Sequence, residues 1–370
     1  MPSAADARPA RRSSSARRQL TMRQIGEMAG VSESTVSRIL SGSDFRIPIA
    51  AATRERVLKV VAELGYTPNP LARALRGARS ALLGLIVREV GDPFFALAID
   101  AITAEARRRG YSVVLGHAHS RAEEAAVLQA TLAAQHCDGT ILLGDVRDES
   151  RLWASLLSST VPLVGLCQGA RSPQIPVVNV DNAQGARLVL DYLYQLGHRR
   201  IGFVQGGWIG DGRERQQAYR AFMRERKLLI TPGYLQRAAN DLAGGFTAGE
   251  ALLALSRPPT AVFAASDVVA LGVLKAAASR GVSVPEQLSV AGFDDIPMAA
   301  YAIPSLTTVR QPIQEMARLA VARVLDGTAE RASPSDRMRL LAPSLITRES
   351  CGPPRPPGPA WPRPGPRRQV

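Results

Sequence analysis

The sequence has few cysteines and no long apolar run, and both features narrow the class of protein. Its three cysteines, Cys137, Cys167 and Cys351, are scattered along 370 residues, so they indicate a reducing cytosol rather than a disulfide framework. No run of about 18 apolar residues suggests a helix that spans a membrane. The arginines near the N-terminus are not followed by an apolar stretch, so this segment does not resemble a secretion signal. We therefore expect a cytoplasmic protein with no membrane partner.

Residue patterns that carry catalysis or hold metals are scarce as well. His117 and His119 lie near Cys137, but no recognised zinc-ligand spacing surrounds them. Residues 80–350 contain no nucleophile elbow, and Gly206-Gly207 is a weak signal for a phosphate-binding loop. The sequence thus predicts neither an enzyme nor a cofactor or metal.

The net charge of +14 is concentrated at the two ends of the chain. Residues 1–79 hold 14 Lys and Arg against 6 Asp and Glu, and residues 351–370 hold four arginines and no acidic residue. Residues 80–350 have a net charge of only +2. A basic N-terminal module favours a polyanion partner, because neutralising phosphates releases counterions.

Thr21 to Ser41 read as two short helices around a tight turn. Thr21 and Gln24 have the spacing of a capping box, and Gly30 permits a left-handed turn. The first helix is expected to bury Ile25, Met28 and Ala29 on one face.

The second helix of the pair begins after Ser32, which is a good N-cap. Its apolar stripe is Val36, Ile39 and Leu40, and this leaves a polar face of Glu33, Ser34, Ser37 and Arg38. A helix-turn-helix that offers its second helix to the major groove has this arrangement. An ordinary helical hairpin at the edge of a domain is the alternative.

A third helix is expected from about Thr53 to Leu64, with Val57, Leu58, Val61 and Leu64 facing inward and Gly65 ending it. Asn69 and Pro70 then start a helix of about two turns, which is too short to be stable alone. This short helix therefore either needs a partner to form or is a linker helix that packs on the next domain.

From Leu82 onward, apolar strands alternate with helices. The strands are expected at 82–87, 112–118, 139–144, 162–167, 177–180, 200–206, 261–266, 288–293 and 338–343. The helices are expected at 94–109, 121–135, 149–158, 182–196, 213–226, 245–256, 267–280 and 312–325. This alternation predicts an α/β body of doubly wound parallel sheets. The number of units is too large for one sheet, so two similar lobes are expected.

A series of short motifs runs along the chain: Ala29-Gly-Val-Ser, Thr35-Val-Ser-Arg, Leu64-Gly-Tyr-Thr-Pro-Asn, Asp92-Pro-Phe-Phe, Asp181-Asn182, Leu196-Gly-His-Arg-Arg-Ile-Gly-Phe, Ser266-Asp267, Gly292-Phe-Asp-Asp and Pro304-Ser-Leu-Thr-Thr-Val-Arg-Gln. In this order the motifs resemble the lac-repressor/galactose-repressor family of bacterial transcription regulators, and the resemblance covers the chain from about Leu20 to Glu349. The resemblance implies a homodimer that binds a near-palindromic operator in double-stranded DNA. It also implies a body like a periplasmic sugar-binding protein, with a small-molecule effector, expected to be a sugar, between two lobes.

The resemblance divides the covered part into a helix-turn-helix domain (20–66), a hinge helix (67–79) and a two-lobed body (80–349). Composition predicts a disordered basic arm (1–19) before it and a disordered Pro- and Arg-rich tail (350–370) after it. The first lobe would comprise about 80–180 and 311–339, and the second about 181–310 and 340–349. A transport-type sugar-binding protein would share the body but would not have the helix-turn-helix segment, and we keep it as the alternative function.

The resemblance also carries roles for DNA-binding residues. Base contacts fall on Glu33, Ser34 and Arg38, although Arg38 could instead clamp a phosphate. Positioning contacts to phosphates fall on Thr21, Ser32, Thr35 and Ser37. In the hinge, Asn69 and Ala72 lie near the DNA and Leu75 matches a minor-groove wedge.

The effector would meet residues that the resemblance places in the cleft: Phe94, Phe95, Arg215, Ser266, Asp294 and Gln311. Phe95 could equally be helix core, and Asp267 is expected to cap a helix rather than bind ligand. Arg213 and Arg215 point differently, so only one should reach the cleft.

Three departures from the family pattern stand out. Gly26 occupies a usual Ala position and weakens the first helix by up to about 1 kcal/mol. Ala50 stands where a capping Ser is common. Cys167-Gln168 replaces an Asp-Arg pair whose Asp often bonds a sugar hydroxyl, and this puts the usual hydroxyl pattern in doubt.

Overall fold

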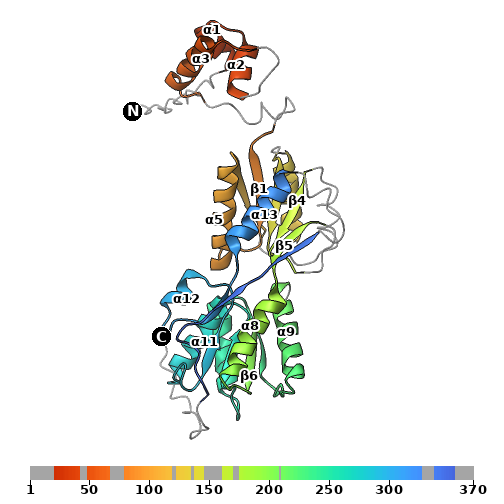
Figure 1. Cartoon of the computed structure of the whole chain (residues 1–370), viewed down its shortest axis with the longest axis vertical. Helices are drawn as coiled ribbons and strands as arrows, with labels where there is room; N and C mark the ends of the chain where they lie inside the picture. The colour runs from red at the N-terminus through yellow and green to blue at the C-terminus, as the bar shows by residue number, and fades with distance from the viewer. Residues whose placement is uncertain are drawn as a thin grey trace, which may run out of the picture. The chain divides into compact units, whose positions relative to one another are not determined.

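The computed structural model describes residues 21–41, 48–66, 79–118, 122–134, 137–145, 161–169, 175–207, 210–326 and 337–354 (Figure 1). The chain divides into two compact units, Met1–Ala78 and Arg79–Val370. The predicted basic arm, the hinge residues Asn69, Ala72 and Leu75, and the helix expected at 149–158 lie outside the described residues. None of the described helices is long and apolar enough to cross a membrane.

The N-terminal unit is a three-helix module. Helix α1 (Met22–Ala29) begins at a complete capping box between Thr21 and Gln24, and Gly30 ends it with φ +65°. Helices α2 (Glu33–Ser41) and α3 (Ala51–Glu63) complete the module. Its small core comprises Met22, Ile25, Ala29, Val36, Ile39, Val57 and Val60.

Two residues expected in this core lie outside it. Met28 is 59% exposed and Leu58 is 46% exposed. At about 100° per residue, Met22, Ile25 and Ala29 define the inner face of α1, and Met28 lies more than a quarter-turn away. On α3, Leu58 likewise points away from the inner face that Val57 and Val60 define.

The two departures in this unit have structural counterparts. A Cβ on Gly26 would lie only 2.6 Å from the carbonyl oxygen of Val31, so glycine lets α1 close onto the turn that follows. Ala50 precedes α3 without any side-chain cap, and the helix begins at Ala51, two residues earlier than expected.

The first lobe of the body is built on a parallel sheet whose described strands have the order β11-β5-β4-β3-β1-β2. The strands are β1 (Leu82–Val87), β2 (Ser112–His117), β3 (Gly139–Leu143), β4 (Leu163–Leu166), β5 (Val177–Val180) and β11 (Met338–Leu341). Helix α13 (Ile313–Leu325) packs on β3, β4 and β5 beside α5 (Pro93–Arg108), while α6 (Ala122–Ala134) packs on β1 and β2 (Figure 1).

The second lobe contains a parallel sheet of order β7-β6-β8-β9 among the described residues. Its strands are β6 (Ile201–Gly206), β7 (Leu235–Ala238), β8 (Ala261–Ala264) and β9 (Ser289–Ala291). Its helices pack in two pairs, α8 (Asn182–Gln195) with α9 (Asp211–Glu225), and α10 (Leu242–Leu253) with α11 (Asp267–Ser279). The short helix α12 (Pro297–Tyr301) and the antiparallel pair β10 (Thr308–Arg310) and β12 (Ser344–Ile346) complete it.

The chain crosses between the lobes after β5, between β10 and α13, and between β11 and β12. The α/β fold class with parallel sheets is therefore confirmed. The first lobe continues to Leu341, which pairs with Val180, two residues beyond the expected crossing. The sequence did not predict β7, α12, β10 or β12. These elements are short and, unlike β4 or β8, they are not fully buried apolar runs.

Residues 350–354, expected in a disordered tail, pack on the second lobe. The Ser350 hydroxyl is buried and donates to the carbonyl oxygen of Val290 at 2.6 Å. The carbonyl oxygen of Gly352 accepts hydrogen bonds from the Ser289 hydroxyl at 3.0 Å and from His198 Nε2 at 2.9 Å. The rest of the tail lies outside the described residues.

Helices α10 and α11 cross closely because glycines occupy the contact. A Cβ on Gly245 would overlap the carbonyl group of Val269, and one on Gly249 would lie 2.7 Å from the Cβ of Ala276. Backbone atoms form the opposing surface at Gly245, so this crossing cannot adjust by a side-chain rotation.

We expect Gly245→Ala to push α10 away from α11 and to lower the free energy of unfolding by about 1–3 kcal/mol. Thermal unfolding followed by circular dichroism measures the loss. Ala251→Leu is the matched control, because Ala251 is exposed on the same helix and extra bulk there meets solvent. Equal melting temperatures for the two variants would contradict the tight crossing.

Candidate functional site

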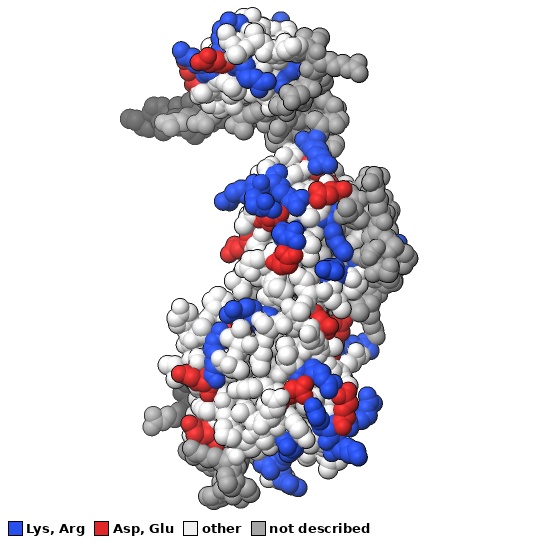
Figure 2. All heavy atoms as spheres, in the orientation of Figure 1, with Lys and Arg blue, Asp and Glu red and all other residues white. Residues whose placement is uncertain are grey.

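Helix α2 presents a polar face away from the core of the N-terminal unit. Val36 and Ile39 are buried, Glu33 and Ser34 are exposed, and Ser37 and Arg38 are half-buried. Several Lys and Arg side chains are visible on this unit in Figure 2. A short helix with one apolar and one polar face can enter a DNA groove while remaining attached to its module.

The start of α2 is organised by hydroxyl groups. Ser32 Oγ accepts from the backbone nitrogen of Thr35 at 3.2 Å, which makes it the expected cap. The same oxygen lies 2.8 Å from Ser34 Oγ and 2.9 Å from Thr35 Oγ1. Helix N-termini bind phosphates through backbone N–H groups and nearby hydroxyls, and both α1, behind Thr21, and α2 offer such an end.

All six cleft residues expected from the sequence line one cavity of about 60 Å³ in the body, hereafter the inner cavity. They are Phe94, Phe95, Arg215, Ser266, Asp294 and Gln311. The first two come from α5 of the first lobe, and Arg215, Ser266 and Asp294 come from the second lobe. Gln311 lies where the chain crosses between the lobes. The residues follow the carboxyl ends of parallel strands, where α/β folds bind ligands.

Arg215 is the centre of the polar network at this cavity. Its guanidinium donates from Nε to Asn182 Oδ1 at 2.8 Å and from one terminal nitrogen to the carbonyl oxygen of Ala265 at 2.6 Å. It pairs with Asp294 at 3.3 Å, and its Cζ lies 3.5 Å from the ring centroid of Phe293. Arg213 is exposed and lines a different cavity, of about 520 Å³, so only Arg215 reaches the inner cavity.

Asp294 is held in an unusual backbone conformation, with φ +117°. Its backbone nitrogen donates to the carbonyl oxygen of Val309, and Gln311 Nε2 donates to its carboxylate at 2.8 Å. Burial raises the pKa of Asp294 to about 7, although Arg215 opposes the shift. Strained backbone and a shifted pKa at one residue are typical of functional sites.

Ser266, not Asp267, caps helix α11. The Ser266 hydroxyl accepts from the backbone nitrogen of Val269 and donates to Asn240 Oδ1 at 2.7 Å. Asp267 is buried one residue further on, where it accepts hydrogen bonds from the Thr308 hydroxyl and from the backbone nitrogen of Ile296. Asp267 therefore ties α11 to the strand ends, and the expectation that it caps the helix is wrong.

Phe94 and Phe95 belong to the core and also reach the inner cavity. Both are about 95% buried, and their ring centroids are 5.9 Å apart. The guanidinium of Arg88 lies 4.7 Å from the ring centroid of Phe95. Phe95 therefore packs in the core of the first lobe and also lines the inner cavity, so both interpretations apply to it.

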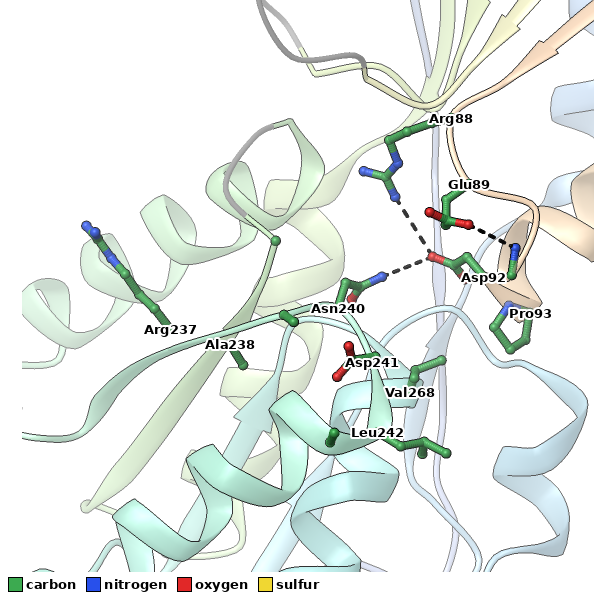
Figure 3. A pocket seen from close by; sticks show the side chains of 14 residues that line it. Arg88, Glu89, Asp92, Pro93, Arg237, Ala238, Asn240, Asp241, Leu242 and Val268 are labelled. Atoms are coloured by element: carbon green, nitrogen blue, oxygen red, sulfur yellow. Dashed lines mark hydrogen bonds and ion pairs between the residues drawn. The ribbon is translucent and has the colours of Figure 1, made fainter. Parts of the chain in front are cut away.

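Several cavity residues were not foreseen, and the most informative are Asp92 and Asn240. Asn240 Nδ2 of the second lobe donates to Asp92 Oδ2 of the first lobe at 3.0 Å, and Arg88 lies 3.9 Å from the same carboxylate (Figure 3). Asp92 also caps α5, and burial raises its pKa. The Asp-Pro-Phe-Phe motif contained Asp92, but Asn240 follows β7, a strand that was not predicted.

These two residues and Arg88 also line a wider cavity of about 750 Å³, hereafter the outer cavity. Glu89, Arg237 and Asp241 lie around it (Figure 3). The inner and outer cavities share the first three of these residues, so the two cavities are adjacent.

The pair Cys167-Gln168 is turned into the protein. Cys167 is buried at the inner cavity, and burial raises the pKa of its thiol. Gln168 is buried, and its Nε2 lies 3.4 Å from the carbonyl oxygens of Leu142 and Gly144. The carboxylate of Asp211, from the second lobe, lines the same cavity as Cys167. It accepts hydrogen bonds from the side-chain amides of Asn179 and Asn182 at 2.8 and 2.9 Å.

Among the described residues, no group of three or more His, Cys, Asp and Glu side chains is arranged to hold a metal ion.

Two family models match the chain. The model for bacterial regulatory proteins of the lacI family matches residues 21–69, and a periplasmic binding protein-like domain matches residues 190–351. The first match covers α1, α2 and α3, and it disfavours a transport protein without a DNA-binding unit.

Relatives match over most of their length. The ribose operon repressor of Haemophilus influenzae is 32% identical over 89% of this chain and 98% of that protein. The transcriptional repressor CytR of Escherichia coli is 37% identical over 83% of this chain and 89% of that protein.

Solved structures show the same arrangement of elements. The lac repressor dimer bound to operator and the anti-inducer ONPF has a TM-score of 0.80 at 27% identity, over 90% of this chain and 100% of that one. The complex of the regulator CelR with cellobiose has a TM-score of 0.66 at 31% identity, over 90% and 99% of the two chains. The chain therefore belongs to the lacI family of bacterial regulatory proteins, and it is a DNA-binding transcriptional regulator that responds to a small molecule.

Proposed function

We propose that the protein is a repressor that binds a near-palindromic operator as a homodimer, under the control of a sugar or sugar derivative in the inner cavity. The observation that carries the proposal is the buried Arg215–Asp294–Gln311 network, which joins α9 to the strand ends of the second lobe. Such a polar network beside two phenyl rings suits a ligand with many hydroxyl groups and an apolar face. A regulator of bacterial genes acts at the chromosome, so we place the protein in the cytoplasm.

On DNA, the polar face of α2 would read one half of the operator. Arg38 suits the O6 and N7 atoms of guanine, Glu33 suits a cytosine amine, and Ser34 suits either kind of base edge. Thr21, Ser32, Thr35 and Ser37 would bind phosphates and set the register. Asn69, Ala72 and Leu75 would act at the operator centre, with Leu75 as the wedge that kinks the duplex.

A near-palindromic site calls for a protein with two-fold symmetry. An apolar patch around α12 supports this assembly: Tyr301 is 86% exposed and Ile303 is 97% exposed, and Met298 is also exposed. Side chains of this size are rarely left together in water unless they meet a partner.

Control by the effector would act through the lobes. The Asn240–Asp92 hydrogen bond joins the two lobes beside the cavity, so a ligand that enters there favours one lobe arrangement over another. A ligand that binds one arrangement better shifts the equilibrium toward it and changes operator affinity by a coupling free energy of about 1–3 kcal/mol.

Selection from a pool of random duplexes, repeated at several salt concentrations, tests operator recognition. We expect the chain to enrich a palindromic site and Arg38→Ala to bind that site roughly 5- to 150-fold more weakly, through loss of about 1–3 kcal/mol. Arg318→Ala is the control, because Arg318 is an exposed arginine of the body paired with Glu315. If no palindrome is enriched, specific recognition is refuted. Equal weakening on all duplexes would instead assign Arg38 to a phosphate.

The double substitution Tyr301→Asp with Ile303→Asp tests the dimer. Charges in an apolar interface are costly to bury, so we expect a monomer at concentrations where the parent sediments as a dimer in analytical ultracentrifugation. Leu229→Asp is the control, because Leu229 is also exposed but lies outside the patch. A dimeric double variant would show that the patch is not the interface, and a monomeric parent would refute the assembly itself.

A further inference from the structure

The inner cavity is lined by more carboxyl groups than guanidinium groups. Asp92, Asp145, Asp211 and Asp294 line it, against Arg88 and Arg215 among the described residues. The outer cavity adds Glu89 and Asp241 against Arg237. Carboxyl groups therefore outnumber guanidinium groups around both cavities.

The two arginines of the inner cavity are already engaged with protein groups. Arg215 is 4% exposed and donates hydrogen bonds to Asn182, to the carbonyl oxygen of Ala265 and to Asp294. Arg88 lies over the ring of Phe95 and near the carboxylate of Asp92. Among the buried donors of these two side chains, only Arg88 Nε has no hydrogen-bond partner in the part of the chain that the structure describes. A phosphate or carboxylate bound there would lie beside the carboxylates of the cavity in a poorly solvated space.

Two residues that line the cavity each carry a buried polar atom without a hydrogen-bond partner among the described residues. Gln311 Oε1 is an acceptor on a side chain that is 97% buried, and Arg88 Nε is a donor. A buried polar atom without a partner is costly, so a group that supplies one is favoured. A hydroxyl group can donate to Gln311 and accept from Arg88, whereas an ammonium group can only donate.

The size of the inner cavity sets how much of the ligand enters it. A volume of about 60 Å³ holds roughly two groups of the size of a water molecule. The remainder of the ligand would occupy the outer cavity of about 750 Å³.

We infer that the inner cavity binds a hydroxyl-bearing end of an uncharged polyol and excludes sugar phosphates and sugar acids. This inference rests on the proposed effector site and specifies its ligand. Asp211 is a specificity-determining residue in it, because its carboxylate stands at the cavity wall 3.9 Å from Arg215 and repels an anion there. The raised pKa values of Asp92 and Asp294 agree with a space in which further negative charge is unfavourable.

The test measures the melting temperature of the full chain with matched compounds at high millimolar concentration. The neutral members are ribose, cellobiose and sucrose, the anions are ribose 5-phosphate and glucuronate, and glucosamine supplies an ammonium group. We expect at least one neutral sugar to raise the melting temperature and both anions to leave it unchanged. An anion that stabilises as well as the best neutral sugar overturns the inference. A stabilising glucosamine without a stabilising neutral sugar also overturns it, as does a panel in which no compound has an effect.

Variants separate the parts of the argument. Gln311→Met removes the unpartnered acceptor at similar volume and should weaken the best neutral sugar at least tenfold in calorimetric titration. Asp211→Asn should let ribose 5-phosphate bind measurably. Asp100→Asn, which removes an exposed carboxylate of α5 that lines neither cavity, should not. Identical anion binding by the two charge variants would refute the role of Asp211.

The operator selection experiment is run on the same preparations. Intact operator selection together with anion binding would refute this inference alone, whereas loss of operator selection in the parent chain would refute the proposed regulator.

Discussion

The buried contact between Arg215 and Asp294 is the interaction on which the ligand site depends. It joins the start of α9 to the loop after β9, and the same guanidinium holds the carbonyl oxygen of Ala265 after β8. Burying two opposite charges is favourable only when further hydrogen bonds satisfy them, and Asn182, Gln311 and the face of Phe293 supply these contacts. Because residues at the ends of β8 and β9 meet in this network, its geometry shapes the side of the cavity that the second lobe provides.

Three chain crossings connect the lobes. Any change in the arrangement of the lobes would therefore bend the backbone at these crossings. Gln311 lies at one crossing and bonds Asp294, while Asn240 bonds Asp92 across the cavity. A ligand that replaces or adds to these contacts changes the relative free energies of the lobe arrangements. The carboxyl groups and unpartnered polar atoms of the inner cavity would then select which ligand can shift the lobe arrangement.

Much of the fold could be predicted from the sequence because its signals are local. The capping box at Thr21, the left-handed glycine at Gly30 and the apolar strands such as Leu82–Val87 depend on neighbouring residues only. The six residues predicted for the cleft came from the family resemblance, and the structure gathers them around one cavity. Met28, Leu58 and Asp267 were misplaced, because which side of a helix becomes buried, and which of two adjacent polar residues caps it, depends on the packing of distant segments.

The family, the helix-turn-helix segment and the alternation of strands and helices can be read from the sequence alone, since each is encoded by spacing along the chain. Three features of the site follow from the folded structure: Asn240 bonds Asp92, Asp211 lines the same cavity as Cys167, and Gln311 Oε1 has no partner among the described residues. These residues are separated by tens to hundreds of positions and come from different lobes. Their charges and hydrogen bonds act together only after the sheets have formed and the lobes have closed around a shared space.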